Sequence, residues 1–209
     1  MNLALFYDTE TTGLPLFNEP SEDPRQPHIV QLGAILVDRD TEKTITAMDV
    51  IVRPDGWTIP KEVADIHGIT TEHAMDVGIP EALAIDMLLA MWFGRMRIAH
   101  NETFDARIVR IALKRLVDPR DPSLVIPLSD EWKDGPSECT ARMATPILKL
   151  PPTEKMIAAG RKHHKTANLS EAYRYFTGKD LENAHSAMAD VEACKEIYFA
   201  MRPKVAEAA

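Results

Sequence analysis

Two carboxylates stand two positions apart at the end of the first apolar run, a spacing that could serve cation chemistry. The chain begins MNLALFYDTETTGLP, in which 3–7 is apolar and Asp8 and Glu10 follow. Alternate residues of a strand point to one face, so both carboxylates are expected on the same side. Two like charges at short range raise each other's pKa unless solvent or a cation screens them. The pair is therefore either a solvated acidic turn or part of a cation site.

Two further acids fall on helix faces that are otherwise apolar. Asp105 lies in the first turn of the predicted helix 101–118, and Asp190 lies near the start of the predicted helix 186–201. A buried charge needs a partner, and no basic residue lies three or four positions from Asp190, so a metal ion is an option. The helix dipole alone could favour Asp105. The residues that share a helix face with Asp105 are Ile108, Val109, Ala112 and Leu116, and those that share one with Asp190 are Ala187, Val191, Cys194 and Tyr198.

A histidine precedes Asp190 by five residues. Five residues of helix turn by roughly 140°, so the two would not share a face if both were helical. We therefore place His185 in the loop before the helix, with Ser186 as the N-cap. From there it could reach a site that Asp190 lines and remove a proton from an attacking water. A plain surface histidine is the alternative.

These residue types suit a particular class of cation. Four carboxylates with no cysteine and at most one histidine favour Mg²⁺ or Mn²⁺. Two such ions, about 3.5–4 Å apart, can clamp the attacking and leaving oxygens of a phosphoryl displacement. We therefore expect two ions per site, with one carboxylate bridging them. In this interpretation the cations neutralise Asp8 and Glu10.

The segments YDTETTGL, HNETFDARIV and AHSAMADVEA follow one another in the order of three known motifs. With them the chain resembles the DEDDh 3′–5′ exonucleases, a family that includes the proofreading subunit of bacterial replicative DNA polymerases and ribonuclease T. HIVQLGAILVD and HGIT are also similar, and the resemblance extends from Leu3 to Met201. It implies a ribonuclease H-like α/β fold, with a mixed β-sheet flanked by α-helices and the carboxylates converging at the sheet.

The resemblance also implies a role for each acid. Asp8 would bridge both metal ions, Glu10 and Asp190 would complete the tighter site, and Asp105 would support the second ion. His185 would be the general base, because a related class has a tyrosine where this chain has Ser186. The implied activity is metal-dependent hydrolysis from the 3′ end of single-stranded nucleic acid, with DNA favoured and nucleoside 5′-monophosphates released.

Substrate contacts are implied by the same resemblance. The residues concerned are Thr11, Thr12, Gly13, Leu14, His67 and Asn101. Leu14 could wedge against a base, and His67 resembles a family histidine near the terminal nucleotide. His67 could equally be a helix-start or turn histidine, and Asn101 a helix cap or loop tether.

Composition limits the remaining possibilities. The chain has 209 residues, which we expect to form one exonuclease domain over 1–209, and a net charge of −8 that argues against coating duplex nucleic acid. The two cysteines, Cys139 and Cys194, lie far apart and predict neither a disulfide framework nor a zinc site. With no signal peptide and no membrane span recognised, we expect a cytoplasmic protein. A polymerase could be a partner, and the oligomeric state stays open.

Apolar periodicity and turn residues predict strands first and then helices between short strands. The runs 28–38 and 44–54, separated by the turn DRDTEK, predict a hairpin. We expect loops in the acidic, proline-rich part 19–27 and in the proline-rich part 118–136. The other expected elements are a strand at 3–7, a helix at 80–93, a strand at 96–100, a helix at 101–118, a strand at 137–141, helical pieces to Leu150, and helices at 167–176 and 186–201.

Residues 141–165 form a basic segment within this acidic chain. It holds six basic residues against one acid, Glu154, which makes +5. The segment is either a solvated loop or a guide for a nucleic acid backbone. The basic residues are Arg142, Lys149, Lys155, Arg161, Lys162 and Lys165.

Three rival functions can be compared with the exonuclease. An RNA-trimming exoribonuclease would share the same fold and residues, and a nucleic-acid-binding module would share them without turnover. A phosphatase with a nucleophilic aspartate is disfavoured, because its motif would be DxD and this chain has DTE at Asp8.

Overall fold

A five-stranded β-sheet forms the centre of the computed structural model, which describes residues 1–116 and 125–202. The strands are β1 (Leu3–Thr11), β2 (Ile29–Asp38), β3 (Thr44–Ile51), β4 (Met96–Ala99) and β5 (Ser137–Cys139). Their order is β3-β2-β1-β4-β5. β1, β2 and β3 pair antiparallel, whereas β4 is parallel to both β1 and β5. The sheet is therefore mixed, and the predicted hairpin is present as β2–β3.

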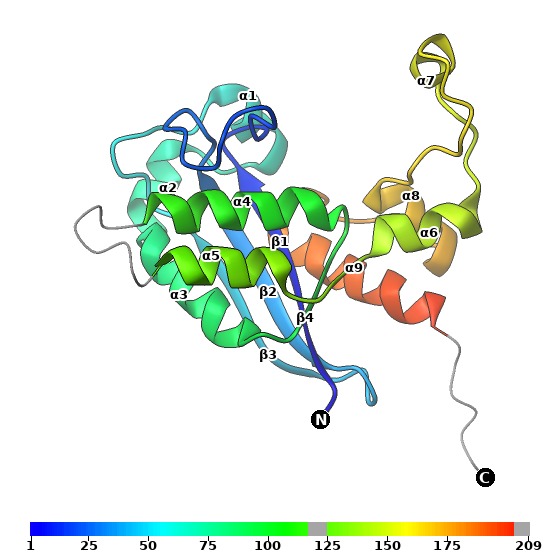
Figure 1. The fold of residues 1–209 in the computed structure, drawn as a ribbon, viewed down its shortest axis with the longest axis horizontal. Coiled ribbons are helices and arrows are strands. Elements are labelled where there is room, and N and C mark those ends of the chain that lie inside the picture. The colour runs from blue at the N-terminus through cyan, green and yellow to red at the C-terminus, as the bar shows by residue number, and fades with distance from the viewer. Residues whose placement is uncertain (117–124, 203–209) are drawn as a thin grey trace.

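Helices cover both faces of this sheet (Figure 1). β1 turns Leu5 and Tyr7 toward the core formed with α3, α4 and α5, and turns Ala4 and Phe6 toward α9. Because strand side chains alternate, Asp8 continues the face toward α9. The helices are α1 (Lys61–His67), α2 (Thr71–Val77), α3 (Glu81–Trp92), α4 (Glu102–Arg115), α5 (Val125–Asp134), α6 (Thr140–Leu148), α7 (Glu154–Ala158), α8 (Leu169–Thr177) and α9 (Ala187–Met201).

The predicted loop 118–136 is wrong over much of its length. Helix α5 occupies Val125–Asp134, while residues 117–124 lie outside the described residues. Trp132 of α5 is fully buried, and its ring meets Tyr7 and Trp92 edge-on at centroid distances of 5.4 and 5.0 Å. Burial of this large aromatic ring against the sheet outweighs the local proline content.

Three short helices were not predicted at all. α1, α2 and α7 have seven, seven and five residues, so none contains enough turns to show an apolar period. Two of them begin at threonine caps, where Thr70 accepts from the N–H of His73 and Thr153 from that of Met156. Helices of this length are stabilised by capping and tertiary contacts. An apolar period in the sequence therefore does not reveal them.

The helix predicted over 80–93 is confirmed as α3. It buries Ala84, Ile85, Leu88 and Trp92 against the sheet, as expected of a core helix. Within residues 1–116 and 125–202, no helix has the length and apolar character that crossing a bilayer requires.

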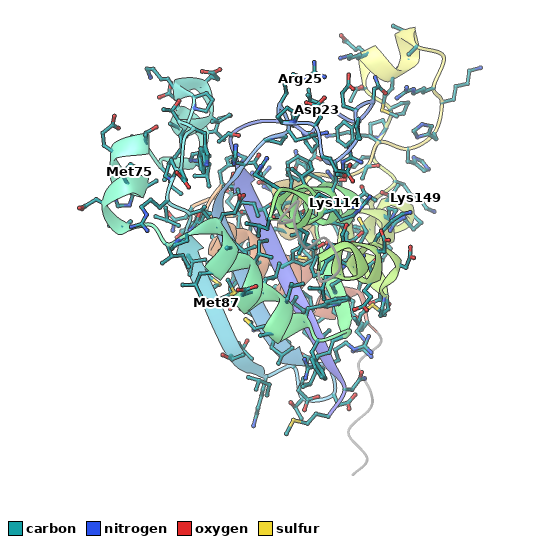
Figure 2. The ribbon with its side chains drawn as sticks, turned by 60° about the vertical axis from the view of Figure 1, so that its left-hand side comes forward. Asp23, Arg25, Met75, Met87, Lys114 and Lys149 are labelled. Carbon is teal, nitrogen blue, oxygen red and sulfur yellow. The ribbon has the colours of Figure 1, made fainter. Side chains whose placement is uncertain are left out.

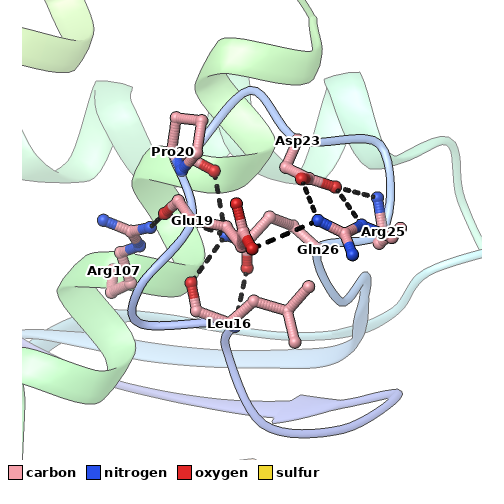
Figure 3. A network of polar contacts seen from close by, with 7 residues as sticks. All are labelled: Leu16, Glu19, Pro20, Asp23, Arg25, Gln26 and Arg107. Atoms are coloured by element: carbon pink, nitrogen blue, oxygen red, sulfur yellow. Dashed lines mark hydrogen bonds and ion pairs between the residues drawn. The ribbon is translucent and has the colours of Figure 1, made fainter.

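One buried glutamine organises the acidic loop 19–27. Gln26 is 2% exposed. Its side-chain amide donates to the carbonyl of Leu16 at 3.1 Å and accepts from the N–H of Leu16 at 3.0 Å (Figure 3). Arg107 of α4 donates to the carbonyl of Glu19. The loop is therefore an ordered structure seated on α4, and not only the solvated loop that its composition suggests.

Gly33 of β2 lets the first turn of α9 lie against the sheet. It pairs with Asp8 in the β1–β2 register. A Cβ atom at Gly33 would stand 2.8 Å from the carbonyl carbon of Ala187 and 2.9 Å from the backbone nitrogen of Met188. Only glycine permits backbone to approach so closely. Any larger residue would push α9, which carries Asp190, away from Asp8.

Gln31 holds the same helix end by hydrogen bonds. Its Oε1 accepts from the N–H of Ala187 at 3.1 Å, and its Nε2 donates to Asp49 at 2.7 Å. Ser186 occupies the N-cap position as predicted, but its side chain makes no capping hydrogen bond. A side chain from the sheet therefore satisfies the N–H of the first residue of α9, one of the first-turn donors that lack an intrahelical partner.

Replacing Gly33 with alanine should destabilise the fold. The added methyl group would overlap backbone atoms of α9, and overpacking of this kind costs typically about 1–3 kcal/mol. Urea denaturation of Gly33→Ala should therefore give a clearly lower free energy of unfolding. The control is Ala47→Gly on β3, where the side chain is exposed and the cost should stay under about 1 kcal/mol. Equal stability of Gly33→Ala and the wild type would contradict the close approach.

Candidate active site

Asp8 is the centre of a group of four acidic side chains. It lies near the end of β1 on the face toward α9. Burial raises its pKa well above its ordinary value, and the charges of Asp105, Asp190 and Glu10 raise it further, in that order. Such effects act over short distances. The four carboxylates that the sequence predicted are therefore brought together by the fold.

Glu10, His185 and Asp190 form a tight subset of this group. One possible ligand atom from each lies within 4.8 Å of the other two. Burial, and then the charge of Asp190, raises the pKa of Glu10 to about 7. Burial raises the pKa of Asp190 to about 6, although the His185 side chain and backbone lower it in part. Ionisation of these acids near neutral pH therefore needs a compensating positive charge.

Asp105 reaches the group from the first turn of α4. It is 2% exposed and accepts hydrogen bonds from the backbone N–H and the hydroxyl of Thr9, at 3.0 and 2.8 Å. Burial raises its pKa to about 8 even though the Thr9 hydrogen bonds lower it. Thr9 points to the opposite face of β1 from Asp8. Asp105 is thus held in place by Thr9, on the face of β1 opposite to that of Asp8.

A buried ion pair that was not predicted from the sequence supports the start of α4. Arg97 of β4 donates to Glu102 at 2.9 Å, and their side chains are 2% and 4% exposed. Arg97 also lies over the ring of Trp132 at 4.6 Å and donates to its carbonyl. Glu102 is three residues before Asp105, so the pair positions Asp105. The sequence feature that could have indicated this ion pair is the single arginine, Arg97, in the otherwise apolar strand MRIA.

His185 occupies the loop before α9, as predicted. Its φ of 69° is left-handed, and so is that of Asn183 at 53°. Residues other than glycine rarely adopt this conformation, which costs energy that the surrounding contacts must offset. The turn brings the exposed ring to Glu10 and Asp190. This geometry allows His185 either to accept a proton or to bind a cation.

His67 approaches from α1 with one free donor. Its Nδ1 accepts from the N–H of Ile69 at 3.1 Å, so the proton of the neutral ring is on Nε2. Nε2 is buried and has no hydrogen-bond partner among the described residues. Burial, and then the charge of His185, lowers the pKa of His67. His67 therefore presents a neutral N–H donor close to His185.

The predicted contacts after β1 have mixed surroundings. The hydroxyl of Thr11 donates to the carbonyl of Gly13 at 2.8 Å, and the hydroxyl of Thr12 accepts from the N–H of His28 at 2.9 Å. Leu14 follows them and is 76% exposed. Each hydroxyl therefore makes one hydrogen bond within the protein, and Leu14 is exposed to a ligand.

Asn101 does not act as the side-chain cap that was one interpretation of it. It occupies the N-cap position of α4 with a left-handed φ of 69°, but its side chain makes no capping hydrogen bond. It is exposed, close to the first turn that carries Asp105. A substrate contact by Asn101 stays a prediction.

The acid group fits divalent cations. One carboxylate oxygen of Asp190, Oδ1, is buried without any hydrogen-bond partner among the described residues. In the same part of the chain, no lysine or arginine forms an ion pair with Asp8, Glu10, Asp105 or Asp190. Hard oxygen donors without a basic partner are the set that Mg²⁺ or Mn²⁺ prefers.

Comparison with protein families gave one match. A family model described as Exonuclease (RNase_T) matches residues 5–198, which is most of the chain. The matched range contains every acidic residue of the site. A comparison with curated proteins found no match.

Several solved structures share the fold. E. coli Exonuclease I in complex with a dT13 oligonucleotide has a TM-score of 0.66 and 22% identity, covering 96% of this chain and 40% of its own. Exonuclease I from Methylocaldum szegediense has a TM-score of 0.66 and 21% identity, covering 99% of this chain and 42% of its own. The zinc ion bound form of the E. coli ExoI–ssDNA complex has a TM-score of 0.64 and 22% identity, with coverage of 96% and 40%.

This chain thus spans about two fifths of the length of the solved structures it matches. At such low identity the likeness establishes the fold, and it confirms the expected ribonuclease H-like arrangement of a mixed sheet between helices.

The buried acids should make the metal-free protein less stable as pH rises. The folded-state pKa values of Glu10, about 7, and Asp105, about 8, lie above their unfolded values. The native state therefore binds more protons, and its stability falls from about pH 4 to about pH 8. Saturating Mn²⁺ should reverse much of this loss, by about 2.7 kcal/mol at a concentration 100 times Kd. Urea denaturation across pH, in chelator and in Mn²⁺, measures both effects.

A pair of variants provides the control for this pH dependence. Asp105→Asn keeps an oxygen to accept from Thr9 and should flatten the slope, whereas Asp55→Asn, at an exposed position, should leave it unchanged. Stability of the chelated wild type that is level or rising between pH 5 and 8 would contradict the burial of ionisable acids.

Proposed function

The chain belongs to the exonuclease family, and from this premise we propose that it is a metal-dependent 3′–5′ exonuclease acting on single-stranded DNA. The observation that carries the proposal is the convergence of four acids near His185: Asp8, Glu10, Asp105 and Asp190. Among the described residues, no lysine or arginine forms an ion pair with any of these acids. Exonuclease I of E. coli, which shares the fold, has been solved with dT13 and dA16 oligonucleotides. These complexes support single-stranded DNA as the substrate class, and the expected products are nucleoside 5′-monophosphates.

The four acids would hold two divalent cations, Mg²⁺ or Mn²⁺. Asp8 suits the bridging position, because the other three carboxylates all act on its pKa. Glu10 and Asp190 would complete one ion's ligands, and Asp105 would support the other. When bound, such ions neutralise the acids and stabilise the charge that develops on the oxygens around phosphorus.

His185 would take the proton from the water that attacks the terminal phosphodiester. One ring nitrogen of His185 lies within 4.8 Å of a carboxylate oxygen of Glu10 and of Asp190, and this geometry supports the role. On the other side, the unpartnered Nε2–H of His67 could donate to an oxygen of the terminal nucleotide. Leu14, which is 76% exposed, could pack against its base.

A ladder assay tests the proposed reaction. With Mg²⁺, a 5′-labelled single-stranded DNA should shorten stepwise from its 3′ end, and excess chelator should stop the reaction. Asp8→Asn should lower kcat by more than the roughly 10–100-fold that loss of a supporting residue costs. Asp86→Asn, an exposed acid on α3, is the control and should be near normal. Full turnover in chelator, or by Asp8→Asn, would sink the proposal, and faster cleavage of matched RNA would assign the substrate to RNA.

The roles of His185 and Asp190 can be separated. His185→Ala should lower the single-turnover rate by about 10²–10⁴-fold, as expected for loss of a general base, while Mn²⁺ affinity stays close to that of the wild type. Asp190→Ala should weaken Mn²⁺ binding itself. Calorimetric titration of Mn²⁺ beside single-turnover rates makes the comparison. If both variants lose Mn²⁺ equally, His185 is a ligand and another group must take the proton.

A further inference from the structure

Residues 150–165, called the arm below, project from the protein between α6 and α8. The N–H of Lys165 donates to the carbonyl of Leu150 at 3.0 Å and closes the base of the arm. Farther out, the N–H of Arg161 donates to the carbonyl of Met156 at 2.8 Å. No residue of the arm is buried, and α7 stands clear of the other helices in Figures 1 and 2. The arm is ordered by its own hydrogen bonds, yet its side chains face solvent.

The arm is positively charged although the whole chain is acidic. It holds four basic residues and one acid, Glu154, so its charge is four minus one, or +3, in a chain of −8. Lys165 pairs with Glu171 of α8. Lys155, Arg161 and Lys162 form no ion pair with any described residue. Three exposed cations therefore remain available, and Lys165, first grouped with them, has a structural role.

The base of the arm is joined to the part of the fold that carries the site. His100 follows β4 directly and precedes α4, the helix of Asp105. Its two ring nitrogens lie 3.1 Å from the carbonyl of Ala167 and 2.9 Å from the hydroxyl of Thr140. Ala167, two residues beyond the arm, is thus held near the carboxyl end of β4, which is parallel to β1, the strand whose end carries Asp8 and Glu10.

The arm and α1 lie at the same end of the molecule, on opposite sides of the loop that contains Asp23 and Arg25 (Figure 2). Both views show α7 and α1 apart from each other at the same end (Figures 1 and 2). Figure 2 shows the loop with Asp23 and Arg25 between them. Since α1 carries His67, the proposed contact to the terminal nucleotide, the arm is placed beside the path of a strand that enters the site.

We propose that the arm binds the sugar–phosphate backbone of the substrate strand upstream of its 3′ nucleotide, through Lys155, Arg161 and Lys162. The proposal rests on the proposed function. A chain of −8 with an acidic site repels a polyanion, so a local group of exposed cations is needed to attract it. Lysine and arginine contacts to phosphates position a strand without reading its sequence, as a non-specific exonuclease requires.

The test removes the three free cations together. In Lys155→Gln/Arg161→Gln/Lys162→Gln, the KM for a 20-nucleotide strand should rise roughly tenfold at low salt, with kcat near normal. A single strand releases about 0.7 counterion per neutralised phosphate, so the slope of log KM against log salt should decrease by about 2. All three side chains are exposed, so the fold should be unaffected.

A matched triple variant controls for bulk charge. Lys43→Gln/Arg53→Gln/Lys133→Gln removes the same charge at exposed positions outside the arm, and its KM and salt slope should stay near those of the wild type. A nitrophenyl ester of thymidine 5′-monophosphate, too short to reach the arm, should be hydrolysed equally by all three proteins. Equal KM changes in the two triple variants, or loss of ester hydrolysis in the arm variant, would overturn the proposal.

Binding without turnover separates this inference from the proposed function. Anisotropy of a labelled strand with Asp8→Asn in Ca²⁺ reports the arm's contribution without cleavage. If the wild type cleaves neither strand nor ester, the proposed function fails, and weaker binding after loss of the arm cations would still support the arm. Unchanged binding would reject it.

Discussion

Repulsion between Asp8 and three neighbouring carboxylates, of which Asp105 is fully buried, is the constraint on which the rest of this structure depends. Burial raises the pKa of each acid, like charge raises those of Asp8 and Glu10 further, and among the described residues no lysine or arginine pairs with the four acids. Groups of this kind are stable at neutral pH only if protons or cations compensate them. The fold therefore gives up stability to assemble the site, a pattern that is typical of sites selected for chemistry rather than for packing.

The elements around the site keep these unfavourable neighbours together. Gly33 lets α9 approach the sheet, and Gln31 holds the first N–H of that helix. Thr9 fixes Asp105 from the opposite face of β1, and the Arg97–Glu102 pair fixes the helix turn before it. Each link joins two elements of the fold, so positional freedom at the carboxylates is small.

Opposite charges are separated along the molecule. The acids meet near the end of β1, whereas Lys155, Arg161 and Lys162 are exposed on the arm and form no ion pair with a described residue. A substrate that must meet divalent cations at one point and be attracted along its backbone at another is served by such separation. The solved exonucleases match nearly all of this chain but extend well beyond it. The role of the arm therefore follows from its own contacts rather than from theirs.

The sequence by itself determined the fold class, the hairpin, the main amphipathic helices and the identity of the converging acids. The hairpin and the helices follow from local periodicity, whereas the fold class and the set of acids follow from the resemblance of three motifs to the exonuclease family. Helix α5 was missed because Trp132 gains its stability from Tyr7 and Trp92, far away in the chain. The short helices α1, α2 and α7 were missed because they contain too few turns for a period.

At the site, only the tertiary structure showed that Gln31 accepts from the first N–H of α9, that Ser186 makes no side-chain cap, and that Glu102 pairs with Arg97. Tertiary structure also showed that Lys165 of the basic segment pairs with Glu171, whereas Lys155, Arg161 and Lys162 form no ion pair with a described residue. Spacing along the chain predicts which residues share a face. Which partner neutralises or satisfies a polar group depends on contacts between distant residues, and these exist only once the chain has folded.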